Sequence, residues 1–350
     1  MGTRPTLQTV ADELGVSRAT VSNAYNRPDP LSPALREKIL GTAQRLGYSG
    51  PDPAARGLRR GQTGTIGVLV GDTLAYAFRD PATGLFLEGI ARAGERAGTS
   101  MLLIPSPKGQ HPIEAIGNAA VDGFCLNCVP DNDPGLRAVL DRRLPTVVVE
   151  GWSGDAPVAR VDIDQRGGAR SAAEHLAGLG HTSFGIITAM LGQDRYAGPV
   201  DAQRLAMADA PADRERVHGF LEAVGDAPIY EAGGHGFERG RAAARALLDA
   251  HPDTTAILAD SDLLALGAMR AAAETGRAVP ADLSVSGFDD IPLAASADPP
   301  LTTVSQPLTD KGEQAYALLQ EMLSGRPPRQ ITLPIELVVR GSTAASPRNG

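Results

Sequence analysis

Several signatures common in enzymes are missing from this 350-residue sequence. It holds no GxxxxGK(S/T) phosphate-binding loop and no GxSxG nucleophile turn, and its GGHGFERG segment lacks the glycine spacing of a dinucleotide-binding turn. The six histidines are dispersed along the chain. The acid pairs Asp162/Asp164 and Asp289/Asp290 are of a kind that usually caps helices or contacts a ligand. We therefore expect no catalysis, no cofactor and no bound metal ion.

Cysteine is scarce, because only Cys125 and Cys128 occur, in the segment CLNC. A CxxC segment can be a redox pair or half of a zinc site, but no second cysteine pair or well-placed histidine pair completes a zinc set. The surrounding GFCLNCV is apolar and strand-like, and strand alternation would place the two thiols on opposite faces of a sheet. We expect ordinary strand cysteines in a reducing cytoplasm.

Long apolar runs are absent as well. No segment offers the ~18 consecutive apolar residues that a membrane-spanning helix requires. The N-terminal MGTRPTLQTVADEL lacks the cationic start and following apolar run of a signal peptide. We expect a cytoplasmic protein with no membrane partner.

Charge is unevenly distributed within a formal net charge of −8. Residues 1–62 hold nine Arg and Lys against five Asp and Glu, a net charge of +4, which leaves −12 for the remainder. A basic segment attracts phosphates and an acidic body does not. The asymmetry fits a small nucleic-acid reader joined to a larger soluble domain, although an excess of four charges is also compatible with scatter.

The stretch from Leu7 to Tyr48 predicts three short helices. Apolar residues recur at helical spacing before Gly15, a residue that tolerates the positive φ of a helix end. Ser17 can cap a second helix at 18–25, and Ser32 followed by proline is a strong start for a third helix, which ends near residue 46. A tight turn between the first two helices predicts a helix-turn-helix, whose second helix lies in the major groove of DNA.

From Thr65 onward, apolar strands alternate with helices. The expected strands are TIGVLV, SMLLIP, DGFCLNCV, PTVVVEG, VARVDID, FGIIT, PIYE, TAILAD, LSVSGFD, LTTVSQP and ITLPIELVV. Such alternation predicts parallel sheets with helices on both faces. Two similar α/β sets with late return segments predict two lobes joined by several crossings, and ligands in such folds bind at the carboxyl ends of the strands.

Six ordered blocks of the sequence resemble the lactose/galactose-repressor (LacI/GalR) family of bacterial transcription regulators. The blocks are VADELGVSRATVSNAYN, PAARGLRRGQTGTIGVLV, ARVDIDQRGGARSAAEHLAGLGH, LGAMRAAAETGRAVPADLSVSGFDDIPLA, PPLTTVSQP and LPIELVVRGST. Together they span nearly the whole chain, which makes the resemblance far more specific than one helix-turn-helix match.

The resemblance implies an all-α DNA-binding headpiece followed by a two-lobed, periplasmic-binding-protein-like α/β sensor. The expected boundaries are 1–50 for the headpiece, 51–62 for a hinge helix or linker, 63–340 for the sensor and dimerisation domain, and 341–350 for a polar tail. Within the sensor we expect lobe 1 at about 63–162 and 290–324, and lobe 2 at about 163–289 and 325–340.

The resemblance also assigns DNA contacts. Arg18 and Ala19 match positions that touch base edges, whereas Ser17 and Thr20 are expected to hold phosphates. Asn23 departs from the arginine common in the family; because arginine reads guanine and asparagine prefers adenine, the operator is expected to differ at that base. The expected DNA-binding residues are Thr6, Ser17, Arg18, Ala19, Thr20, Asn23, Ala55, Arg56, Leu58 and Arg59.

The segment Ala54 to Arg60 is either a flexible linker or a hinge helix that orders on DNA. Seven residues make a marginal helix, and Gly57 costs roughly 1 kcal/mol relative to alanine. The resemblance favours the hinge, with Leu58 as an apolar wedge in the minor groove.

Effector contacts likewise follow from the resemblance. Asp289, in SGFDDI, matches an acidic residue that accepts hydrogen bonds from effector hydroxyls or amines, and a carboxylate offers about four acceptor sites. Arg216 matches an effector-binding arginine, and a surface salt bridge is the alternative for it. The expected effector-binding residues are Phe78, Asp80, Asn127, Trp152, Arg216, Ser261 and Asp289.

Taken together, these features predict a ligand-responsive repressor of transcription. We expect it to bind a pseudo-palindromic, double-stranded operator as a homodimer and to respond to a small polar effector, a sugar or a nucleoside. A sugar-binding protein of the transport type is the alternative, which the helix-turn-helix and the missing signal peptide disfavour. An enzyme on an α/β scaffold is a further alternative that no motif supports.

Overall fold

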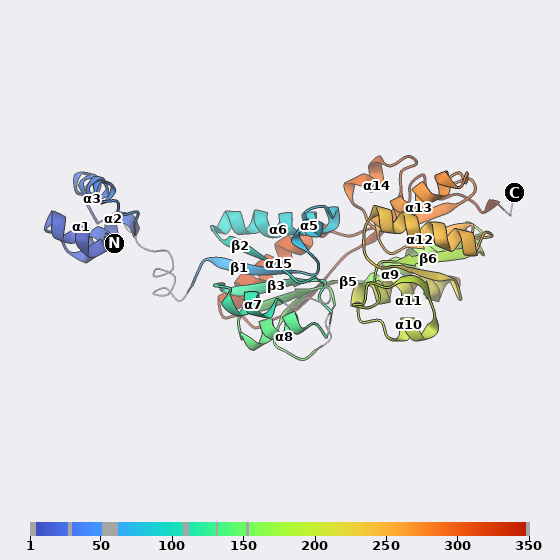
Figure 1. Ribbon diagram of the computed structural model, residues 1–350, viewed down its shortest axis with the longest axis horizontal. Coiled ribbons are helices and arrows are strands. Elements are labelled where there is room, and N and C mark those ends of the chain that lie inside the picture. The colour runs from blue at the N-terminus through green and yellow to red at the C-terminus, as the bar shows by residue number, and fades with distance from the viewer. Residues whose placement is uncertain are drawn as a thin grey trace. The chain divides into compact units, whose positions relative to one another are not determined.

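The computed structural model describes residues 5–26, 30–50, 62–107, 112–130, 132–151 and 154–347. The chain divides into two compact units, Met1–Gly64 and Thr65–Gly350. The described part of the first unit is all-helical, and the second unit is an α/β body (Figure 1). The expected fold class is therefore confirmed.

The headpiece consists of α1 (Leu7–Leu14), α2 (Arg18–Asn26) and α3 (Pro33–Arg45). Thr6 caps α1 through a reciprocal pair of bonds with Thr9, and Gly15 ends that helix with a φ of 66°. Ser17 Oγ accepts a hydrogen bond from the Thr20 amide at 3.0 Å, so it caps α2 as expected. Each cap satisfies backbone donors that a helix start leaves free.

One apolar cluster holds the three helices together. Val10, Val21 and Ile39, one from each helix, are fully buried in it. The start of α2 faces the other way, because Ser17, Arg18 and Ala19 are exposed. The packing therefore leaves the N-terminal end of α2 free to contact a partner.

The body is built from strands and helices with the following bounds. The strands are β1 (Thr65–Val70), β2 (Ser100–Pro105), β3 (Gly123–Asn127), β4 (Thr146–Val149), β5 (Ala159–Ile163), β6 (Phe184–Thr188), β7 (Ala197–Val200), β8 (Ile229–Ala232), β9 (Ala256–Ala259), β10 (Ser284–Asp289), β11 (Thr302–Ser305), β12 (Gln330–Leu333) and β13 (Glu336–Val338). The helices are α5 (Leu74–Ala77), α6 (Pro81–Ala97), α7 (Ile113–Asn118), α8 (Pro134–Asp141), α9 (Gln165–Gly178), α10 (Ala202–Ala206), α11 (Pro211–Val224), α12 (Phe237–Ala250), α13 (Asp262–Glu274), α14 (Pro292–Ser296) and α15 (Leu308–Leu323).

The first sheet is parallel throughout, in the order β12-β5-β4-β3-β1-β2. Alternation along β1 separates its two faces: Ile66 and Val68 lie in the cluster that contains Phe86 of α6, whereas Leu69 lies with Leu136 of α8. Helices α6 and α15 therefore cover one face, and α7 and α8 cover the other (Figure 1).

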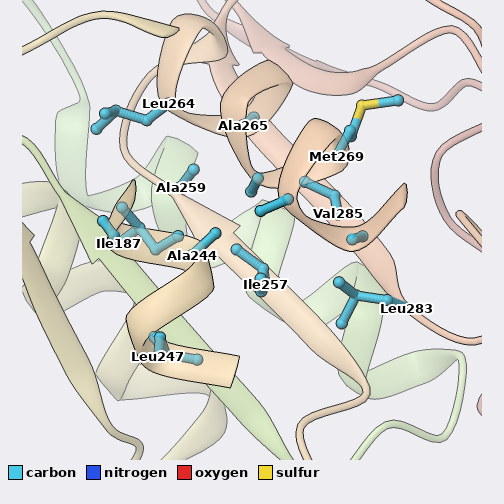
Figure 2. Packing of buried hydrophobic residues seen from close by; sticks show 14 of the residues in the cluster. Ile187, Ala244, Leu247, Ile257, Ala259, Leu264, Ala265, Met269, Leu283 and Val285 are labelled. Carbon is cyan, nitrogen blue, oxygen red and sulfur yellow. The ribbon is translucent and has the colours of Figure 1, made fainter. Parts of the chain in front are cut away.

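The second sheet has the order β13-β11-β10-β9-β6-β8-β7, and its edge strands β13 and β7 are antiparallel to their neighbours. Figure 2 shows the core on one face, where Leu247 of α12 and Met269 of α13 pack with Ile257 of β9. Helices α9 and α11 cover the opposite face, with Leu176 and Phe220 fully buried there. Each sheet thus has apolar helices on both sides, as the alternation of strands and helices predicts.

The lobe boundaries differ from the expected ones. The two sheets define lobe 1 as 65–163 and 308–333, and lobe 2 as 164–305 and 336–347. Strand β11 pairs with β10 in lobe 2, although residues 290–305 were expected in lobe 1. The segment ITLPIELVV forms two strands in different sheets, because Pro334 has no N–H to continue a ladder.

The two cysteines also differ from the expected pattern. Cys125 is buried within β3, whereas Cys128 lies beyond the end of that strand, exposed, with a φ of 51°. Cys128 is therefore not a strand residue, and strand alternation does not apply to it.

Helices α6 and α15 approach closely because glycines lie where they cross. A Cβ added at Gly89 would lie 2.0 Å from the carbonyl oxygen of Thr309, and one at Gly312 would lie 2.1 Å from that of Phe86. Gly84, in the same helix as Gly89, faces open space. The close contact between α6 and α15 thus requires glycine at positions 89 and 312, whereas position 84 could hold a larger residue.

Gly89→Ala is expected to lower the free energy of unfolding by about 1–3 kcal/mol, because the added methyl group forces the two helices apart. Gly84→Ala is the matched control, and its higher helix propensity should raise stability by up to ~1 kcal/mol. Urea unfolding followed by circular dichroism measures both changes. Similar effects of the two substitutions would contradict the crossing as described.

Candidate functional site

A cavity of about 150 Å³ is lined by residues from both lobes of the body. Asn127 ends β3 and Glu150 follows β4 on the side of lobe 1, whereas Asp289 ends β10 and Gln306 follows β11 on the side of lobe 2. The carboxyl ends of parallel strands thus converge on one cleft, the place where α/β folds of this type bind ligands.

An ion pair between Asp289 and Arg216 forms one wall of this cleft. Arg216 Nη1 lies 3.4 Å from Asp289 Oδ1, and both side chains are buried. The guanidinium is fixed further by Nε, which donates to Gln165 Oε1 at 2.6 Å, and by Nη1, which donates to the Asp260 carbonyl at 2.6 Å. It also stacks 3.8 Å from the centre of the Phe288 ring. These contacts hold the arginine in one orientation before any ligand arrives.

Several polar atoms of the cleft are left without a partner within the described chain. Ser261 Oγ is buried and has no hydrogen bond there. The hydrogen bonds to the Asp289 carboxylate, from Arg216 and Gln306, both reach Oδ1, which leaves Oδ2 without a donor among the described residues. Buried polar groups in native proteins are normally paired, so atoms of this kind indicate a binding position.

A second buried ion pair lies at the base of the cleft. Lys311 of α15 contacts Glu150, and its ammonium also donates to Gln306 Oε1. Gln306 Nε2 then donates to Asp289 Oδ1 at 2.5 Å. A continuous polar chain therefore runs from lobe 1 through Lys311 to Asp289 in lobe 2.

Three residues with strained backbone conformations also line the cavity. Cys128, Glu150 and Asp289 line the cavity with φ values of 51°, 57° and 122°, a region that favours glycine. Cys128 Sγ donates to Glu150 Oε2 at 3.2 Å. Strained non-glycine residues persist where the surrounding structure fixes them, and they concentrate at binding sites.

Known proteins resemble this chain over both the headpiece and the α/β body. Residues 173–343 match the family model described as a periplasmic binding protein-like domain. An HTH-type transcriptional regulator of Mycobacterium tuberculosis is 42% identical, over 98% of this chain and 98% of its own. Among solved structures, the lac repressor dimer bound to operator and the anti-inducer ONPF has a TM-score of 0.78 and 27% identity, over 98% of this chain and 100% of that one. The chain belongs to the LacI/GalR family of transcription regulators.

A further solved structure, the complex of the transcriptional regulator CelR with cellobiose, has a TM-score of 0.69 and 30% identity, over 97% of this chain and 100% of that one. These relatives are named as regulators of transcription, and this regulator is not an enzyme. Within the described ranges, no three His, Cys, Asp or Glu side chains gather as a metal site would need. None of the helices in those ranges is both long and apolar enough to cross a membrane.

The structure brings most of the expected effector residues of the regulator together. Asp80, Asn127, Arg216, Ser261 and Asp289 all line the cavity. Asp80 also caps α6, with Oδ2 accepting from the Thr83 amide at 3.1 Å.

Two expected effector residues are not placed there. Phe78 ends α5 with 72% of its surface exposed and does not line the cavity. The neighbouring Tyr76 does line it, as does Phe86, and the Tyr76 ring centre lies 6.2 Å from that of His235 in lobe 2. Because α5 is a single helical turn, two positions along it face opposite ways. Trp152 lies outside the described residues.

Only some of the expected DNA-contacting residues lie within the described part of the chain. Thr6, Ser17, Arg18 and Ala19 are exposed in the headpiece, and Thr20 and Asn23 are half-buried on α2. The four expected hinge residues, Ala55, Arg56, Leu58 and Arg59, lie outside the described residues.

Sequence reasoning missed Lys311, Glu150, Gln306 and Asp213, all of which line the cavity. A signal for the first was present, because Lys311 interrupts the apolar face of α15 between Leu308 and Ala315. A lysine on the buried face of a helix needs a specific partner, and that partner is Glu150.

Burial shifts several pKa values in and around the cleft. It raises the pKa of Asp289 well above its ordinary value, an effect that Arg216 opposes. It raises the pKa of Asp260 to about 8 and that of Asp262 to about 7, and lowers that of Lys311 to about 7. The pKa of Tyr76 is raised by burial and further by four surrounding carboxylates. Burial is therefore the main cause of these shifts, and acidic groups outnumber cationic ones in the cleft.

The pKa of Asp260 gives the regulator a pH-dependent stability. Because its folded pKa of about 8 lies above the ordinary 3.8, the folded protein binds more protons than the unfolded chain between these values. The contribution of Asp260 to stability therefore falls as pH rises from about 4 to 8. Asp260→Asn should flatten this decline, since the amide oxygen can still accept from Thr188 and the Ala189 amide.

Thermal midpoints measured from pH 4 to 8 check this expectation. Asp249→Asn is the control, because Asp249 is exposed and paired with Arg245. An unchanged pH profile for Asp260→Asn would show that Asp260 is already ionised throughout this range.

Proposed function

We propose that the regulator is a repressor whose headpiece binds a pseudo-palindromic operator as a homodimer and whose cleft binds a small polar effector. A sugar is the favoured effector, ahead of a nucleoside. The observation that carries the effector part is the set of unsatisfied atoms in the cleft, Ser261 Oγ and Asp289 Oδ2, beside the fixed Arg216 guanidinium. Neighbouring hydroxyls can donate to the carboxylate and accept from the guanidinium at the same time.

The relatives support this proposal. The lac repressor structure is a dimer on its operator, and the CelR structure is a complex with cellobiose. Both extend over at least 97% of this chain, so both the headpiece and the body have counterparts in them.

The proposed mechanism is linkage between the cleft and the DNA reader. The effector favours one arrangement of the two lobes, and that arrangement changes how readily residues 54–60 order on DNA. A ligand shifts such an equilibrium only by its difference in affinity for the two states. The interlobe pair between Asp72 and Arg195, at 3.5 Å, is a contact whose geometry a lobe movement would change.

Arg18→Ala is expected to weaken binding to the preferred operator by about 1–3 kcal/mol and to relax specificity at one base of each half-site. Arg18 begins α2 and is exposed, so its loss removes a base contact without disturbing the core. The control is Arg45→Ala, because Arg45 is an exposed residue of α3 paired with Glu13 at 3.0 Å. Selection from random duplexes followed by titration measures both variants. A wild-type chain with no preference over random DNA would contradict the proposed function.

Asp289→Asn is expected to weaken effector binding by about 1.5–3 kcal/mol, because a charged acceptor of effector hydroxyls is replaced by a neutral group. Asp290→Asn is the control: Asp290 is the next residue, but it pairs with Arg340 at 2.6 Å and does not line the cavity. A thermal-shift screen of sugars and nucleosides identifies a ligand, and calorimetry then compares the three proteins. Equal affinity of wild type and Asp289→Asn would remove Asp289 from the effector site.

A further inference from the structure

The described lining of the cleft is strongly acidic. Five carboxylate side chains line it, against two cationic ones. The acidic residues are Asp72, Asp80, Glu150, Asp213 and Asp289, and the cationic ones are Lys311 and Arg216. His235 is the only histidine among them. Because Asp72 is paired with Arg195 at 3.5 Å, the excess of negative charge that an effector meets comes from Asp80 and Asp213.

Both cations are already neutralised by the protein. Lys311 is one of three lysines in the whole sequence, is 2% exposed, and contacts Glu150 and the side-chain amide oxygen of Gln306. Arg216 is 6% exposed and faces Asp289, Gln165 and a backbone carbonyl. Removing one member of a buried ion pair is costly because it strands the other charge. Lys311 is thus not free to serve as the counter-ion of an anionic ligand, and the positive charge of Arg216 is balanced by Asp289.

Asp213 has no such compensation. It lies on α11, is 7% exposed and lines the cavity, and its carboxylate has no hydrogen bond within the described chain. Its charge nevertheless reaches across the cleft, because it raises the pKa of Tyr76 together with Asp80, Asp289 and Asp72. The carboxylate faces the cavity, so a ligand or water in the cleft can donate a hydrogen bond to it.

The negative charge of the lining and the volume of the cavity together limit which ligands can bind. Charges interact more strongly in a poorly solvated pocket than in water, so a phosphate or carboxylate brought beside Asp213 and Asp289 would meet strong repulsion. Hydroxyl or amine groups would instead donate to these carboxylates and to Ser261. The cavity of about 150 Å³ is smaller than the roughly 300–1,000 Å³ of pockets that hold drug-sized ligands, which favours a compact ligand.

We propose that the effector is a compact polyhydroxylated molecule of about monosaccharide size that carries no anionic group, so that sugar phosphates and sugar acids are excluded. This inference rests on the proposed effector function of the same cleft. It narrows that function, because the LacI/GalR fold by itself does not specify the charge of the effector.

The test separates a bacterial polar metabolite extract on an anion-exchange resin. The flow-through contains neutral and cationic molecules, and the salt eluate, desalted afterwards, contains the anionic ones. Each fraction is added to the full-length regulator, and both the thermal midpoint and the affinity for the selected operator are measured. We expect the flow-through to shift both quantities and the eluate to shift neither, and treatment of the extract with a phosphatase should leave the activity intact.

Activity retained on the resin, or destroyed by the phosphatase, would overturn the inference while leaving the regulator assignment in place. A regulator that binds its operator but responds to neither fraction would overturn it as well. A chain that selects no operator sequence would instead contradict the proposed function, so the two failures are distinguishable.

Variants of the cleft provide a second arm. Glu150→Gln combined with Asp213→Asn removes two negative charges and leaves Lys311 without its carboxylate. The anionic fraction is then expected to raise the thermal midpoint of the double variant, whereas Asp290→Asn should behave as wild type. A folded double variant that still ignores the anionic fraction would show that charge is not what excludes anions.

Discussion

The contact between Arg216 and Asp289 is the one on which the cleft depends. Arg216 comes from α11 and Asp289 from the end of β10, and their pair is buried, where each charge would be costly alone. Gln306 and Lys311 extend the pair into lobe 1, and Gln165 and the Asp260 carbonyl anchor it in lobe 2. A ligand that binds Asp289 therefore acts on a network that spans both lobes.

The charged residues of the cleft have two different roles: some are paired within the protein, and others are available to a ligand. Lys311 and Glu150 satisfy each other and are structural, because neither needs a ligand in order to be paired. Within the described chain, Ser261 Oγ is buried without a hydrogen bond, and the donors to Asp289 reach only Oδ1. A ligand or water can therefore offset the desolvation of these two groups. We propose that these atoms mark the effector site and that the acidic lining of the cleft excludes anionic effectors.

Much of this architecture could be predicted from the sequence. The alternation of apolar strands with helices is local, so most of the expected strands and the caps at Ser17 and Asp164 agree with the structure. The short edge strand β7 was not expected. The lobe assignment of β11 and β12 could not be predicted, because strand pairing is a long-range property and Pro334 divides one apolar segment between two sheets. Among the site residues, Asp289 and Arg216 could be placed by their motifs. Tyr76 was missed because the short helix α5 turns it, and not Phe78, toward the cavity, and Lys311 because its partner is distant in sequence.

The central claim is that occupancy of the cleft controls the headpiece through one thermodynamic coupling. Linkage is reciprocal. If the effector changes the affinity for the operator by a given factor, the operator changes the affinity for the effector by the same factor. The most direct measurement is the affinity of the full-length regulator for an extract-derived, purified effector, with and without saturating operator duplex. The two effector Kd values are expected to differ by roughly 5- to 150-fold, as for typical coupled sites. Identical Kd values in the presence and absence of operator would contradict it.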